Sequence, residues 1–106
     1  MKVSGFTPER VDRFVRSGRG AKGALEAWRK VVDNARWTKY ADIRATFRHA
    51  DHVGSCIVFN LGGNKFRLIA KIKYETDDSE GRIYVVSILT HAEYDTEKWK
   101  KDCGCG

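Results

Sequence analysis

The sequence predicts an α+β fold in which N-terminal helices pack on a small antiparallel sheet. Three observations lead to it. Apolar residues recur at helical spacing over 24–34, they alternate with a period of two over 65–74, and a Gly-Gly pair joins that stretch to an earlier apolar run. Helices that precede a run of strands are typical of the α+β class. The 106 residues hold no internal repeat and no long linker, so we expect one domain over residues 1–106.

Two helices are expected before the sheet. Residues 7–9, Thr-Pro-Glu, suit a helix start, because threonine can cap, proline fits the first helical position and glutamate favours the first turn. This helix would end near Ser17, where a glycine-rich break begins. The second would run from about Ala24 to Asn34, with Trp28 on its apolar stripe and therefore in the core. A short helical turn is expected over 38–44.

Three strands and a last helix are expected in the second half. The strands cover about 56–59, 65–74 and 82–89. The first two are joined by a tight hairpin loop at 61–64, where Gly-Gly tolerates positive φ. The third strand is apolar on both faces, which suits a central position in the sheet. A short helix over 94–101 would pack its tryptophan inward.

The composition bears on partners and location. Lys and Arg outnumber Asp and Glu by 20 to 14, which gives a net charge of +6. This balance favours a polyanionic partner such as RNA, although a protein can be basic without binding one. No apolar run approaches the ~20 residues of a membrane span, and the start does not resemble a signal peptide. We therefore expect a cytoplasmic protein without a membrane partner.

The three cysteines are few and odd in number, which indicates a reducing compartment and free thiols. Cys103 and Cys105 stand at the C-terminus, where two thiolates do not complete a tetrahedral zinc site. We expect no metal, no cofactor and a disordered tail.

The strand over 65–74 places four cations on one face. Such a strip could hold a phosphate backbone through charge-assisted hydrogen bonds, or it could be a solvated outer face. The four cations are Lys65, Arg67, Lys71 and Lys73.

The end of the third strand, 90–95, crowds an imidazole, two carboxylates and a phenol into six residues. RNA cleavage by the 2′-hydroxyl needs a base, an acid and cations around the phosphate. His91, Glu93 and Tyr94 are residue types that could supply the first two. The alternative is a polar strand exit in which Asp95 caps the last helix.

Two stretches resemble the HigB toxin family: 58–69, VFNLGGNKFRLI, and 89–95, LTHAEYD. The resemblance covers roughly Cys56 to Trp99. It implies the compact α+β fold of RelE-like toxins and metal-independent endoribonuclease activity on messenger RNA, typically on the translating ribosome. It also implies neutralisation by HigA, a helix-turn-helix antitoxin.

The resemblance implies that the residues of the hairpin loop shape the turn. It also implies that the polar residues of the two matching stretches form the functional site. The competing hypothesis is a non-catalytic RNA- or ribosome-binding regulatory module that uses the same basic face. The expected catalytic residues are Arg67, His91, Glu93 and Tyr94, and the expected RNA-binding residues are Lys65, Lys71, Lys73 and Arg82.

Overall fold

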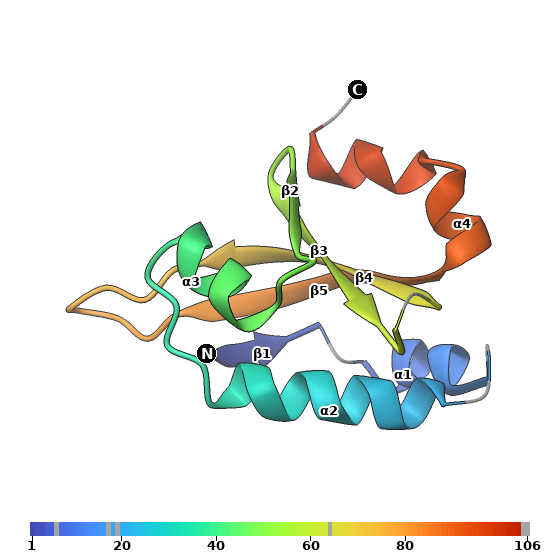
Figure 1. The fold of residues 1–106 in the computed structure, drawn as a ribbon, viewed down its shortest axis with the longest axis horizontal. Helices are drawn as coiled ribbons and strands as arrows, with labels where there is room; N and C mark the ends of the chain where they lie inside the picture. The colour runs from blue at the N-terminus through green and yellow to red at the C-terminus, as the bar shows by residue number, and fades with distance from the viewer. Residues whose placement is uncertain (6, 17, 19, 64, 105–106) are drawn as a thin grey trace.

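A five-stranded mixed sheet forms the centre of the molecule, with strand order β1-β5-β4-β3-β2 (Figure 1). The computed structural model describes residues 1–104 except 6, 17, 19 and 64. Neighbouring strands pair antiparallel, apart from β1, which pairs parallel with β5. The α+β prediction is confirmed, and the parallel edge strand is an addition to it. The strands are β1 Lys2–Ser4, β2 Asp51–Val53, β3 Cys56–Leu61, β4 Phe66–Lys73 and β5 Arg82–Thr90.

Helical segments lie on both faces of this sheet (Figure 1). The α1 and α2 helices cover one face, and the C-terminal α4 and η1 lie against the opposite one. No helix in the described part of the chain is long and apolar enough to span a bilayer. The helices are α1 Pro8–Arg16, α2 Ala21–Asp33, α3 Tyr40–Thr46, α4 His91–Asp95 and the 3₁₀ helix η1 Lys98–Cys103.

The larger core lies between the sheet and the N-terminal helices. Alternate residues of β4, from Phe66 to Ala70, are buried there, as the period of two predicts. Trp28 of α2 is also buried and meets Phe59 edge to face, with ring centroids 5.5 Å apart. The predicted core position of Trp28 is confirmed.

A second, smaller core lies on the opposite face, under η1. It contains Cys56, Val58, Ile69, Trp99 and Cys103. Because this face is covered too, β4 is buried on both sides from 66 to 70. The inward packing of the C-terminal tryptophan is confirmed.

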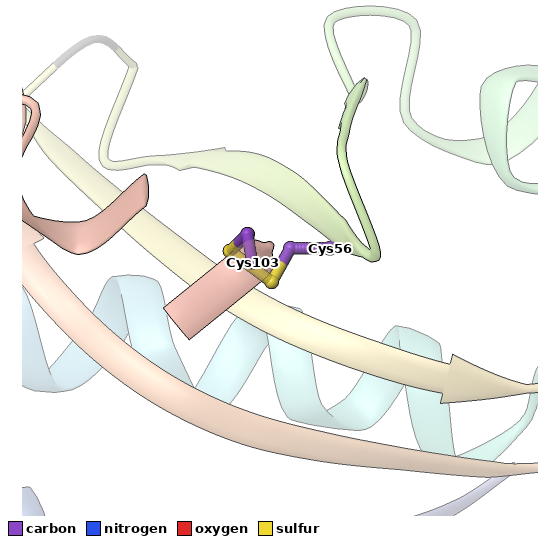
Figure 2. Close-up of a disulfide and its surroundings, with 2 residues drawn as sticks. All are labelled: Cys56 and Cys103. Atoms are coloured by element: carbon purple, nitrogen blue, oxygen red, sulfur yellow. A yellow bond between two sulfur atoms is a disulfide. The ribbon is translucent and has the colours of Figure 1, made fainter. Parts of the chain in front are cut away.

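A disulfide joins Cys56 at the start of β3 to Cys103 at the end of η1, and it lies in this second core (Figure 2). The expectations of free thiols and of a disordered tail are therefore wrong for this pair. The two cysteines are 47 residues apart, and only the return of η1 over the sheet brings them together. Cys105 lies outside the described residues.

Element boundaries differ from the predicted ones for local reasons. The α2 helix begins at Ala21, three residues earlier than expected, directly after Gly20 at φ 82°. Gly23 therefore lies inside the helix. The expected last helix is two pieces, α4 and η1, separated by Glu97 at φ 61°. The hairpin glycines Gly62 and Gly63 have the expected positive φ, 60° and 71°.

Candidate functional site

The β4–β5 hairpin brings the expected catalytic residues to one end of the sheet. In its register, Arg67 lies opposite Leu89, and Phe66 lies opposite Thr90. The chain turns from β5 directly into α4 at this point, which places Tyr94 beside β4. The Arg67 guanidinium carbon is 5.1 Å from the centroid of the Tyr94 ring. Two of the expected catalytic residues are therefore in contact.

Tyr94 also contacts Trp99 of η1. The two rings are stacked, with centroids 5.0 Å apart and an interplanar angle of 13°. The Trp99 indole N–H also donates to the Tyr94 carbonyl oxygen at 2.9 Å. The Tyr94 ring therefore contacts both a guanidinium and an indole, and cation–π attraction and stacking stabilise these contacts.

Arg67 is a buried cation, with only 8% of its surface exposed. Its Nη1 donates to the Phe66 carbonyl oxygen at 3.2 Å. Burying a charge costs free energy unless the charge is hydrogen-bonded or paired, and an arginine stays protonated even there. The site thus holds a fixed positive charge whose direction is set by β4 and by the Tyr94 ring.

His91 begins α4, and Asp95 ends it one turn later. The His91 Nδ1 is 3.1 Å from Asp95 Oδ2, and the imidazole side chain is 48% exposed. A neutral imidazole that donates its Nδ1–H to a carboxylate keeps a lone pair on Nε2, where it can accept a proton. Asp95 therefore orients His91 instead of capping the last helix. The i,i+4 spacing of the two residues is the feature of the sequence from which this pair could have been predicted.

Glu93 closes a capping box at the start of α4. The Thr90 hydroxyl accepts from the Glu93 backbone N–H at 3.2 Å, and the Glu93 Oε1 accepts from the Thr90 N–H at 3.1 Å. The other carboxylate oxygen lies 3.8 Å from Arg13 Nη2 of α1, a contact between distant segments that no local pattern predicts. This carboxylate thus fixes both the start of α4 and its position against α1.

Two hollows flank Glu93 on the β5 side. One, of about 270 Å³, reaches Arg13 and Phe14 of α1, and the other, of about 390 Å³, reaches Trp99 of η1. Both are lined by Ser87 and Leu89 of β5. A single-stranded segment that crosses α4 would therefore meet a recessed surface on either side of this carboxylate.

The expected RNA-binding cations do not form one continuous strip with Arg67. Lys71 lies opposite Tyr84, and Lys73 lies opposite Arg82. Lys71 is four residues from Arg67 along β4, roughly 13 Å at strand spacing. The buried Ile69 separates them, because η1 and the second core cover that part of the face. Lys65 is exposed beside Arg67, whereas Lys71, Lys73 and Arg82 gather at the other end.

Comparisons with known proteins identify the family of the chain. A family profile described as HigB_toxin, RelE-like toxic component of a toxin–antitoxin system, matches residues 21–97. The matched part includes α2, α3 and all four expected catalytic residues, whereas β1, α1 and η1 lie outside it.

Three curated relatives match at the same level. They are the mRNA interferase toxin HigB of Escherichia coli strain K12, and the proteins named mRNA interferase HigB of Escherichia coli O157:H7 and Shigella flexneri. Each is 29% identical over 77 residues, which is 70% of this chain and 70% of the relative. The chain belongs to the HigB toxin family, the RelE-like toxic components of toxin–antitoxin systems.

Proposed function

We propose that this toxin is an endoribonuclease that cleaves messenger RNA on the translating ribosome in the cytoplasm. The observation that carries the proposal is the pairing of a buried guanidinium, Arg67, with the ring of Tyr94, which lies in the same short helix as the His91–Asp95 pair. The relatives are named mRNA interferases, which supports the same substrate.

In the proposed reaction, the 2′-oxygen of one nucleotide attacks the adjoining phosphorus as a base takes its proton. The bond to the 5′-oxygen of the next nucleotide breaks as that oxygen gains a proton. The products are a 2′,3′-cyclic phosphate and a 5′-hydroxyl. The reaction needs two proton transfers and a positive charge beside the phosphorane, and we assign no step to a metal or cofactor.

The residues divide these tasks according to their surroundings. His91 and Tyr94 carry the proton transfers, and Arg67 stabilises the charge that develops on the phosphate. Glu93 contributes by holding His91 and Tyr94 in place through the capping box. The cations Lys65, Lys71, Lys73 and Arg82 neutralise the RNA backbone.

The competing function, a non-catalytic RNA- or ribosome-binding module, has one observation in its favour. Arg67 exposes only 8% of its surface, so little of its guanidinium is open to a phosphate. In that case the protein would arrest translation by occupancy, and no message would be cut.

The experiment is to induce the protein and to map new 5′ ends on cellular messages. We expect growth arrest and new 5′-hydroxyl ends inside translated frames. Arrest without new ends would establish the non-catalytic function.

A toxin of this kind requires a neutralising partner, which we propose is a HigA-like helix-turn-helix antitoxin. Co-expression with the adjacent reading frame should restore growth and yield a stable complex. Recovery of the toxin alone from such a strain would contradict this partner.

A further inference from the structure

A second polar surface lies on the same sheet face as Arg67, beyond the part that η1 covers. Strand register builds it in two rows across β1, β5 and β4. The first row contains Lys2, Arg82 and Lys73. The second row contains Ser4, Tyr84 and Lys71. We call these six residues the β1–β5–β4 surface.

The charge of this surface is available to a ligand. Within the described residues, Lys2, Lys71, Lys73 and Arg82 make no ion pair with a carboxylate. The three lysines are exposed, and Arg82 is half-buried. Adjacent strands lie about 4.8 Å apart, so the first row spans about 10 Å between its outer Cα atoms. Cations at that spacing can neutralise neighbouring phosphates of one strand.

Tyr84 is an exposed aromatic ring among these cations, with 43% of its surface open to solvent. The Arg82 guanidinium carbon lies 5.8 Å from the centroid of this ring, and its Nη1 donates to the Tyr84 hydroxyl at 3.2 Å. The other large apolar side chains of β5 are at least half-buried, whereas Tyr84 is exposed. The Tyr84 ring is therefore not required for packing of the core. An exposed ring held by a cation is a suitable surface for stacking a nucleic-acid base.

The neighbouring loop limits the direction in which a polyanion can leave. Residues 75–80 join β4 to β5 directly beyond the first row, and they include Asp77, Asp78 and Glu80. Their negative charge repels phosphates. A strand bound on the two rows is therefore directed away from this loop, and η1 covers the part of the face between Lys71 and Arg67.

We infer that the β1–β5–β4 surface is a platform for single-stranded RNA. The four cations hold phosphates, and Tyr84 stacks one base. The inference rests on the proposed function and adds to it Lys2, Tyr84 and a preference for unpaired nucleotides. An acidic peptide would satisfy the cations but would leave the exposed ring without a role.

The test is binding of the full chain to a short, unstructured 2′-O-methyl RNA, which cannot be cut by its own 2′-oxygen. We expect Tyr84→Ala to weaken binding on the order of tenfold, because loss of one stacked base has about this effect. Tyr84→Phe should bind like the wild type, and a duplex of the same sequence should not respond to Tyr84→Ala.

A charge variant tests both rows together, because Lys73 belongs to the first row and Lys71 to the second. Lys71→Gln with Lys73→Gln should reduce the slope of log K against log salt by about 1.4, since each contact with a single strand contributes about 0.7. The matched control is Lys22→Gln with Lys30→Gln on α2, which removes the same charge from two exposed positions on the other side of the sheet. This control should change the slope much less.

Three outcomes would overturn the inference: no binding by the wild type at low salt, a change below twofold for Tyr84→Ala, or an equal loss in the α2 control. A polyglutamate peptide that binds as well as the RNA would identify an acidic protein segment as the ligand and would also overturn it. Cleavage of ribosome-bound message separates this inference from the proposed function. If the wild type cuts message and Tyr84→Ala changes neither KM nor binding, only the platform is wrong.

Discussion

The guanidinium of Arg67, on β4, lies over the ring of Tyr94, on α4, at 5.1 Å from its centroid. The two residues are separated by most of the β4–β5 hairpin, and they meet because α4 folds back over the start of β4. This contact joins a buried charge to an ionisable phenol at the end of the sheet where His91 also lies. It is the geometric basis for assigning the chemistry to this end of the molecule.

His91 should contribute to the chemical step and little to the fold. Its side chain is half exposed and its one described polar partner is Asp95. We expect His91→Ala to reduce single-turnover cleavage of ribosome-bound message by on the order of 10²–10⁴-fold at saturating toxin. The melting temperature should stay close to that of the wild type. Asp95→Asn, which keeps a partner for the imidazole, should have a smaller effect on the rate.

The assignment of His91 depends on both measurements together. A wild-type cleavage rate at saturation would show that the imidazole takes no part in the reaction. A strongly lowered melting temperature would show that its role is structural.

Trp99 should act through Tyr94. Trp99→Phe keeps an aromatic ring against Tyr94 but removes the indole N–H that donates to the Tyr94 carbonyl oxygen. The loss of one partner of a part-buried hydrogen bond should reduce the free energy of unfolding by about 1–3 kcal/mol, as measured by urea denaturation. The cleavage rate should fall while the KM for message stays unchanged, because Trp99 acts by positioning the Tyr94 ring. A changed KM with an unchanged rate would contradict this role.

The long periodic elements of the fold could be predicted from the sequence, and the short ones could not. Patterns over β4, β5 and α2 contain enough residues to distinguish a period of two from a helical period. The strands β1 and β2 contain three residues each, too few for any period to be visible. The place of β1 also depends on Gly5, at φ 88°, because the backbone of Val85 leaves no room for a Cβ there.

The site was predictable where it depends on local pairing and unpredictable where it depends on distant segments. A hairpin between β4 and β5 was enough to bring Arg67 near Tyr94. The covering of the sheet by η1 brings together Cys56 and Cys103, which are 47 residues apart, and no local pattern indicates it. Because η1 covers this part of the sheet, Arg67 is buried. The strip of cations that the alternation of side chains along β4 predicts is divided in two.

The role of Glu93 can be separated into proton transfer and helix capping by one substitution. Glutamine can take the place of glutamate in a capping box but cannot transfer a proton. If Glu93 holds α4 in place, Glu93→Gln should keep most of the cleavage activity. Glu93→Ala should lower the free energy of unfolding by about 1 kcal/mol through loss of the cap. Loss of cleavage in Glu93→Gln at an unchanged unfolding midpoint would instead establish the carboxylate as catalytic.

The disulfide should stabilise the fold and, through η1, the site. Joining residues 47 positions apart restricts the unfolded chain, so Cys103→Ser should reduce the free energy of unfolding by about 2–4 kcal/mol. Cys105→Ser is the matched control, because Cys105 takes no part in this bond. The wild type treated with a dithiol should behave like Cys103→Ser, and the control should behave like the oxidised wild type.

The consequence for the site follows from the position of Cys103 at the end of η1. Trp99 lies in the same 3₁₀ helix and stacks on Tyr94, so release of Cys103 should loosen that stack. We expect the reduced protein to show weaker near-ultraviolet circular dichroism from Trp99 and slower cleavage at saturating toxin, at a temperature where the protein remains folded. Wild-type dichroism and cleavage after complete reduction would show that the packing of the second core alone holds η1 against Tyr94.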